Sequence, residues 1–243
     1  MTKTHHRHPT RNRPVRRLVG TGLLLVSAWV ASAQAAQVNV LCSMNPEWCR
    51  SAAAVYERLH GVSVSVINKP TGESYAQIVA EKERPRVDVW FGGTADPHFQ
   101  AAEQGLLAEY KSPQLSQLYP WAQDAAKASG YKTVGLYSEV LGIAYNTEIL
   151  AKKKLAAPKC WKDLANPAYR GEVQMANAQS SGTSYVAIAT FVQIMGEEAA
   201  FKFMQAMNAN VSAYSRQGLG PIKAVAKGES ALSVSFLHNA AQE

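Results

Sequence analysis

The sequence predicts an α/β protein with two lobes, each a sheet flanked by helices, and a ligand cleft between the lobes. Three observations support this prediction. Short apolar strands alternate with amphipathic helices from residue 37 onward, the alternation starts again near Gly171, and polar loops follow several strands. Two such units facing each other would enclose a cleft. We expect the first lobe over residues 37–140 and the second, with the hinge crossing, over 141–243.

The first lobe is predicted to contain three strand–helix pairs and a parallel sheet. A glycine at 61 ends the first helix, and a polar turn over 70–74 precedes the second. The expected strands are 37–42, 62–67 and 87–91, and the expected helices are 46–60, 75–83 and the segment after Thr94. The first helix has an apolar stripe that we expect to face inward, formed by Trp48, Ala52, Val55, Tyr56 and Leu59. In the polar, helical segment 111–133, Trp121 is the expected core anchor.

The second lobe repeats the pattern after an apolar run at 134–145, which predicts one or two strands. Asn146 is an N-cap residue and predicts a helix through Lys154, and Trp161 belongs to a short helix. Gly196 separates two further helices. The remaining expected strands are 172–176, 211–215 and 231–237, and the remaining helices are 182–195, 197–207 and 222–227.

Residues 1–36 have the parts of a cleavable secretory signal peptide, which predicts an exported protein. A basic region ends at Arg17, an apolar run covers 18–30, and small residues follow. The run is too short to favour a membrane anchor. Six of the positive charges lie in this leader, so the net charge of +7 falls to +1 without it. The basic composition therefore gives no reason to expect nucleic acid as a partner.

Three cysteines stand in a chain that is predicted to be exported to an oxidising compartment. Cys42 ends the first strand and Cys49 lies in the first helix, so a short disulfide between them is expected, although the spacing alone does not prove it. Cys160 is then left over.

The strongest functional signal is a set of small polar residues that follow predicted strands. In the stretch 87–107 a strand, a glycine turn and a helix start come in succession, and a second helix opens at S-S-G-T-S over 180–184 with no acid nearby. Unpaired N–H groups at helix starts suit an anion. Simple N-capping by Ser181 or Thr183 is the alternative explanation. The predicted ligand-binding residues are Ser43, Thr71, Gly72, Ser74, Gly92, Gly93, Thr94, Ser181, Gly182, Thr183, Tyr214, His238 and Asn239.

The sequence contains few signatures of enzymes. There is no H-E-x-x-H, G-x-S-x-G or P-loop motif, and the histidines at 60, 98 and 238 form no metal-spaced pair. The sequence therefore predicts a binding protein without catalytic residues, cofactor or metal site. The alternative function from another class is a secreted α/β hydrolase with His238 as its base. The alternative roles of His238 and Tyr214 are structural, with both side chains packed in the protein and not in contact with a ligand.

Several motifs together resemble a known family. They are C-S-x-x-x-x-W-C at 42–49, A-E-K at 80–82, D-V-W-F-G-G at 88–93, Y-N-T-E at 145–148, C-W-K-D-L at 160–164, S-S-G-T at 180–183 and S-F-L-H at 235–238. The chain is similar to the periplasmic solute-binding proteins of ABC importers, of the type II fold, in the branch that binds ferric iron or sugar phosphates. This resemblance implies a monomer that closes around a small anionic solute and delivers it to a permease in the inner membrane.

Two departures from the family bear on the ligand. Iron-binding members have adjacent tyrosines where this chain has Phe236, Leu237 and His238, so a sugar phosphate or another organophosphate is the expected ligand and ferric ion the alternative. Sugar-phosphate members have an acid after the histidine, where this chain has Asn239. Similar proteins also continue beyond the point that corresponds to residue 243, into a segment that would complete the first lobe and bring a cysteine to Cys160. We therefore expect a truncated chain with an incomplete first lobe.

Overall fold

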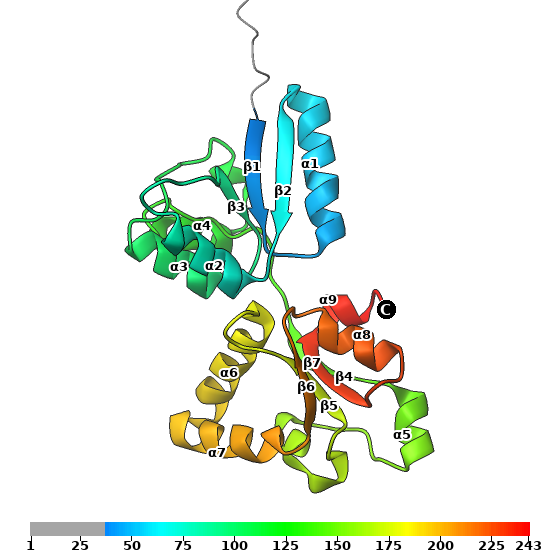
Figure 1. Cartoon of the computed structure of the whole chain (residues 1–243). Helices are drawn as coiled ribbons and strands as arrows, with labels where there is room; N and C mark the ends of the chain where they lie inside the picture. The colour runs from blue at the N-terminus through cyan, green and yellow to red at the C-terminus, as the bar shows by residue number, and fades with distance from the viewer. Residues whose placement is uncertain (1–36) are drawn as a thin grey trace, which may run out of the picture. The chain divides into compact units, whose positions relative to one another are not determined.

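The computed structural model describes residues 37–243, which form two sheets with helices packed beside them (Figure 1). The predicted signal peptide at 1–36 lies outside the described residues. The strand order is β2-β1-β3 in the first sheet and β4-β7-β5-β6 in the second. Within the described residues, no helix has the length and apolar character to cross a membrane. The expected α/β architecture with two helix-flanked sheets is confirmed.

The first sheet is parallel, as predicted. It consists of β1 (Gln37–Cys42), β2 (Ser63–Asn68) and β3 (Val89–Phe91), and the central strand β1 pairs Val40 with Val66 on one side and with Val89 on the other. Because parallel strands end at the same edge, the loops after β1, β2 and β3 all begin there. This edge therefore holds most of the polar residues that the sequence singled out.

The helices of this part begin and end close to the predicted residues. Their bounds are α1 (Pro46–His60), α2 (Thr71–Ala80), α3 (Ala95–Glu103), the 3₁₀ turn η1 (Leu115–Gln117) and α4 (Pro120–Ala128). The Asn45 side chain accepts the Glu47 N–H at 3.0 Å and starts α1, and Gly61 ends it with φ +64°. One boundary was wrong: residues 71–74 form the first turn of α2 and not a loop before it, so their backbone N–H groups belong to a helix N-terminus.

Two predictions of core positions in this part were wrong. In α1 only Cys49 is buried, and Trp48, Val55, Tyr56 and Leu59 are exposed while Ala52 is half-buried. The physical reason is that α1 packs along β2, which is an edge strand of the sheet, and the positions of Val55, Tyr56 and Leu59 stay open to solvent. Trp121 is 43% exposed; its ring packs against Gly135, where an added Cβ would meet it at 2.2 Å, and not in the core.

The second sheet is mixed. It contains β4 (Leu141–Tyr145), β5 (Val173–Ala176), β6 (Val211–Ser215) and β7 (Leu232–Phe236). Strand β5 pairs in parallel with β6 and β7, whereas β4 pairs antiparallel with β7, opposite Leu232 to Phe236. The apolar run at 134–145 gives only this one strand, since residues 134–140 have no strand partner.

The helices of the second part are α5 (Thr147–Lys153), η2 (Trp161–Ala165), η3 (Pro167–Tyr169), α6 (Gly182–Met195), α7 (Glu197–Asn208), α8 (Gly220–Ala226) and α9 (Leu237–Ala240). The core lies between these helices and β5 and β7. There Phe191 of α6 is fully buried, with Trp161 at 5.3 Å and Phe203 at 5.1 Å between ring centroids. This part of the chain therefore has a continuous hydrophobic core of its own.

The predicted disulfide is present and joins Cys42, at the end of β1, to Cys49 in α1. Both sulfurs are buried, so the bridge fixes the start of α1 against the strand end that carries Ser43. Cys160 is unpaired and exposed among the described cysteines.

The cap of α5 provides a test of this fold. Asn146 accepts the N–H groups of Glu148 and Ile149 at 3.0 and 3.1 Å and donates its amide to the Val225 carbonyl of α8 at 2.9 Å. We expect Asn146→Ala to lower the free energy of unfolding by about 1–2 kcal/mol. Asn146→Asp, which keeps only the cap, should lose less. Urea denaturation measures both variants.

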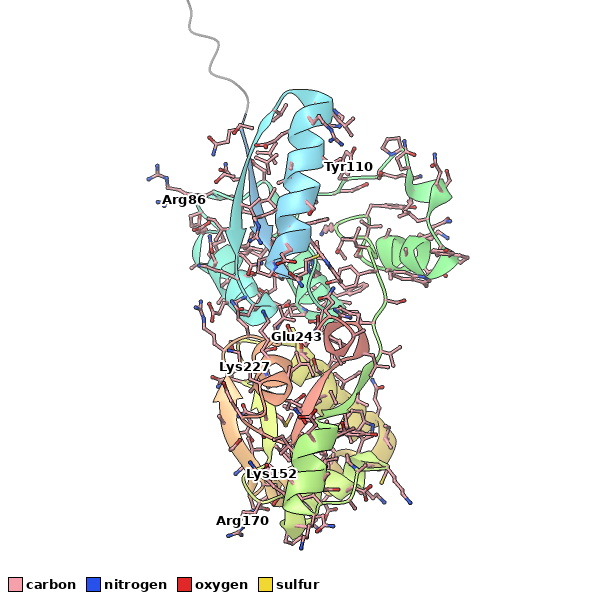
Figure 2. All side chains as sticks on the ribbon, turned by 90° about the vertical axis from the view of Figure 1, so that its right-hand side faces the viewer. Arg86, Tyr110, Lys152, Arg170, Lys227 and Glu243 are labelled. Carbon is pink, nitrogen blue, oxygen red and sulfur yellow. A yellow bond between two sulfur atoms is a disulfide. The ribbon has the colours of Figure 1, made fainter. Side chains whose placement is uncertain are left out.

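Lys152, exposed on α5 (Figure 2), provides the control, because its side chain forms no hydrogen bond or ion pair with a described residue. An Asn146→Ala protein as stable as the Lys152→Ala protein would contradict the role of the cap.

Candidate functional site

A cavity of about 80 Å³ opens between the strand-end loops of the two sheets. Nine of the predicted ligand-binding residues line it: Ser43, Thr71, Gly93, Thr94, Ser181, Gly182, Thr183, His238 and Asn239. They come from the ends of β1, β2, β3, β5 and β7, so segments far apart in the sequence meet in one place. The cavity is the candidate binding site.

Three further predicted residues lie beside the cavity and shape it without lining it. Ser74 is fully buried and accepts the Ser43 hydroxyl at 2.8 Å. Gly72 donates its N–H to the Ser180 carbonyl at 2.9 Å, and Gly92, with φ +73°, leaves room for Met44. These residues hold the loops in place, so their predicted contact with a ligand gains no support from the geometry.

Tyr214 lies elsewhere. Its hydroxyl donates to Asn208 Oδ1 at 2.7 Å, and its ring lines a separate apolar cavity of about 370 Å³ beside α6 and α7. Burial of the ring raises the pKa of the Tyr214 hydroxyl. The reason is the alternation of β6, which turns Tyr214 toward α7 and not toward the loops at the strand end. We therefore leave Tyr214 out of the candidate site.

Two uncapped helix N-termini meet in the cavity. Helix α3 begins after Thr94 and α6 begins after Ser181, and neither N-cap side chain bonds its helix. A Cβ added to Gly182 would lie 2.5 Å from Thr94 Oγ1 and 2.9 Å from Thr71 Oγ1, so both hydroxyls crowd the start of α6. The Ser181 side chain therefore does not cap α6. The N–H groups at the two helix starts and the nearby hydroxyls suit an anionic group.

The Thr94 hydroxyl supports this interpretation. Thr94 Oγ1 is buried and has no hydrogen-bond partner among the described residues. A buried polar atom without a partner costs free energy, and a ligand oxygen at this point would satisfy it.

Ser43 is held in place by neighbouring side chains. Trp90 Nε1 donates to Ser43 Oγ at 2.9 Å, and Ser43 Oγ donates to Ser74. The Trp90 ring stacks on His98 with 3.7 Å between centroids, and His98 Nε2 lies 3.0 Å from the Gly92 carbonyl. Burial lowers the pKa of His98, so this imidazole is neutral at physiological pH. The cluster fixes the ends of β1 and β3 relative to each other.

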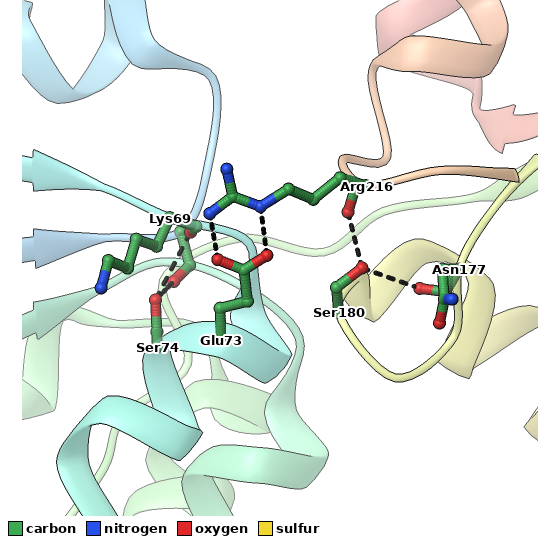
Figure 3. Close-up of polar contacts among 7 residues, drawn as sticks. Lys69, Glu73, Ser74, Asn177, Ser180 and Arg216 are labelled. Atoms are coloured by element: carbon green, nitrogen blue, oxygen red, sulfur yellow. Dashed lines mark hydrogen bonds and ion pairs between the residues drawn. The ribbon is translucent and has the colours of Figure 1, made fainter. Parts of the chain in front are cut away.

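An ion pair joins the two sides of the cavity (Figure 3). The Arg216 guanidinium, in the loop after β6, donates two hydrogen bonds to the Glu73 carboxylate of α2. Ser180 strengthens this contact, because its hydroxyl donates to the Arg216 carbonyl at 2.8 Å and its own carbonyl accepts the Gly72 N–H. The hydrogen bonds from Arg216 lower the pKa of Glu73, so this carboxylate stays ionised.

Sequence reasoning missed Tyr137 and Glu139, which also line the cavity. The Tyr137 hydroxyl accepts the Gly93 N–H at 3.0 Å. Glu139 has a side chain only 16% exposed, with Oε1 3.3 Å from His238 Nε2. Burial raises the pKa of Glu139 to about 7 and lowers the pKa of His238. The available signal was an acid inside an apolar run at 134–145.

Glu139 makes stability depend on pH. Its carboxyl binds a proton more tightly in the folded protein than in the unfolded chain, whose pKa is near 4.5. The free energy of unfolding should therefore fall as pH rises from about 4.5 to 7 and level off above, by roughly 3 kcal/mol at most. We expect Glu139→Gln to lose this fall, as measured by urea denaturation between pH 5 and 8.

His238 acts with the opposite sign below pH 6.5, so the informative quantity is the difference between wild type and variant. Glu148→Gln, the same change at an exposed position of α5, should follow the wild-type curve. Parallel curves for wild type and Glu139→Gln would contradict the burial of an ionisable carboxyl.

Comparison with known proteins identifies relatives that bind small solutes. A family model described as "Bacterial extracellular solute-binding protein" matches residues 87–243. A Haemophilus influenzae protein is 41% identical over 93% of this chain and 66% of its own length. The structure of the periplasmic binding protein AfuA from Actinobacillus pleuropneumoniae, with fructose 6-phosphate bound, has 42% identity and a TM-score of 0.82 over 85% of this chain and 65% of that one.

A more distant structure shares the fold alone. Iron-bound HitA from Pseudomonas aeruginosa is 22% identical, with a TM-score of 0.69 over 83% of this chain and 63% of its own. This chain thus spans about two thirds of the length of the relatives that it matches. The family match extends over more than half of the chain and includes both sides of the cavity, so the chain belongs to the bacterial extracellular solute-binding proteins.

Proposed function

We propose that the chain is the solute-binding component of an ABC importer and captures a small anionic solute, a sugar phosphate or another organophosphate. The observation that carries the proposal is the meeting of two uncapped helix N-termini, at Thr94 and at Gly182, in one cavity. Backbone N–H groups and hydroxyls there suit the oxygens of a phosphoryl group. AfuA, which has fructose 6-phosphate in its structure, supports this choice of ligand class.

The proposed ligand set divides into two groups. Ser43, Thr71, Gly93, Thr94, Ser181, Gly182 and Thr183 receive the anionic group, and His238 and Asn239 hold the remainder of the solute. Asn239 is 5% exposed and has an amide that both donates and accepts, so it suits a hydroxylated ligand. Members of this family bind solutes and catalyse no reaction, so we expect no enzymatic activity of this chain.

Binding would couple to closure of two lobes, the first over residues 37–140 and the second over 141–243. The contacts of Glu73 with Arg216 and of Gly72 with Ser180 cross between the sheets and would hold the closed form. The similarity to AfuA, a periplasmic binding protein, supports a periplasmic location, and an ABC permease in the inner membrane is the proposed partner. We also propose that the protein is a monomer and that residues 1–36 are its signal peptide.

Ferric ion is the alternative, favoured only by iron-binding relatives such as HitA. Ferric ion prefers hard anionic oxygen ligands. The cavity presents Phe236 where a phenolate would be needed, and its one tyrosine, Tyr137, has a pKa raised by burial, which disfavours the phenolate. The residues at this site therefore fit an organic anion better than a ferric ion.

A thermal melt of the full purified chain tests the proposed ligand. We expect fructose 6-phosphate to raise the melting temperature and ferric citrate to leave it unchanged, because only the phosphate ester matches the helix N-termini. A ligand at 100 times its dissociation constant adds about 2.7 kcal/mol to the free energy of unfolding. A shift with ferric citrate alone would contradict the organophosphate assignment.

Gly182→Ala tests the anion site directly. A Cβ at this position meets Thr94 Oγ1 at 2.5 Å and must displace it, so we expect the affinity for fructose 6-phosphate to fall at least about tenfold. Isothermal titration calorimetry measures the affinity. Lys152→Ala, at an exposed position of α5 that does not line the cavity, provides the control and should bind like wild type. Unchanged affinity in Gly182→Ala would place the phosphoryl group elsewhere.

A further inference from the structure

The described residues that line the cavity carry few charges, and these are unevenly placed. Glu139 is the one acid among them, and Lys69 and His238 are the basic residues. Glu139 contacts His238, whereas the helix N-termini at Thr94 and Gly182 contact Thr71. The end of the cavity at the helix N-termini therefore favours a negatively charged ligand group, and the end at Glu139 carries a negatively charged side chain when this carboxyl is ionised.

Aromatic rings surround the end with Glu139. The Trp48 ring lies 5.3 Å from the His238 ring and presents an edge-to-face contact to Tyr137 at 6.4 Å between centroids. Tyr137 connects the two ends, since its hydroxyl accepts the Gly93 N–H next to Thr94. Trp48, Tyr137 and His238 all line the cavity, so its wall carries aromatic surface near Glu139.

We propose that Glu139 is a specificity-determining residue, which accepts hydroxyl groups from the uncharged end of the ligand and disfavours a ligand with a second anionic group there. The inference rests on the proposed function, because it requires one phosphoryl group at the helix N-termini. It narrows the ligand class to polyhydroxylated monophosphates and separates them from bisphosphates.

The preference for hydroxyls follows from the contacts of the carboxylate. Glu139 Oε1 faces His238 Nε2 at 3.3 Å, and Oε2 has no hydrogen bond to any described residue. A carboxylate oxygen accepts and does not donate, so a ligand hydroxyl is its natural partner. The rings of Trp48 and Tyr137 supply apolar surface against which the C–H groups of a sugar can pack.

The rejection of a second anion follows from burial and charge. A carboxylate 16% exposed is poorly screened by water, so its repulsion of a phosphate a few ångströms away is stronger than at the surface. His238 faces Glu139 from α9 and, with its pKa lowered by burial, is neutral above pH 7. Lys69, in the loop after β2, is the other charged residue on the cavity wall. Glu139 pairs with His238 and forms no ion pair with Lys69, so the lysine does not neutralise this carboxylate.

The experiment compares fructose 6-phosphate with fructose 1,6-bisphosphate by calorimetry at pH 8, where Glu139 is ionised. For the wild-type chain we expect the monophosphate to bind at least about tenfold more tightly. Glu139→Gln keeps the size of the side chain and removes the charge, so it should reduce this preference at least about tenfold. Glu148→Gln, on the exposed side of α5, should leave the preference unchanged.

Each other outcome is decisive. Equal affinities in wild type, or an unchanged preference in Glu139→Gln, would overturn the inference while the proposed function stands. An equal loss of both ligands in the variant would show a merely structural role and would also overturn it. If fructose 6-phosphate fails to bind wild type, the proposed function falls and the inference falls with it.

Discussion

The close approach of the two helix N-termini at Gly182 is the constraint on which the rest of the site depends. Thr94 and Thr71 fill the space that a Cβ of residue 182 would occupy, so the start of α6 can lie against the loops of the first sheet only with glycine there. This contact places one helix dipole from each sheet at the same cavity. It also explains why the loops that follow β1, β3 and β5 meet, although they are distant in the sequence.

Such an arrangement needs rigid loops, and the structure shows how they are held. The disulfide from Cys42 to Cys49 fixes the start of α1, and the Trp90 indole holds Ser43 through its hydroxyl. Buried Ser74 completes this network from α2. None of these groups carries charge, so they order the loops without competing with the helix N-termini for an anion.

The fold was largely predictable from sequence, because alternating strands and capped helices are local signals. Asn146 and Gly61 marked helix ends correctly, and the polar residues at strand ends gathered as expected. What failed depends on neighbours far along the chain. Whether Tyr56 of α1 is buried depends on another element packing over it, and the direction of the Tyr214 side chain depends on how β6 is oriented in its sheet. Glu139 and His238 are almost a hundred positions apart, so no local sequence pattern predicts their contact.

The engagement of Arg216 by Glu73 bears on how strongly an anion can be held. A free guanidinium in the cavity would bind a phosphate through charge-assisted hydrogen bonds. Here both of its donated bonds go to a carboxylate, so the anion would meet backbone dipoles and hydroxyls. Arg216 instead joins the loop after β6 to α2, a contact that would stabilise the closed form under the proposed function. If the lobes close as proposed, the ion pair would stabilise the closed form while other groups bind the anion, so the solute could still be released when the lobes open.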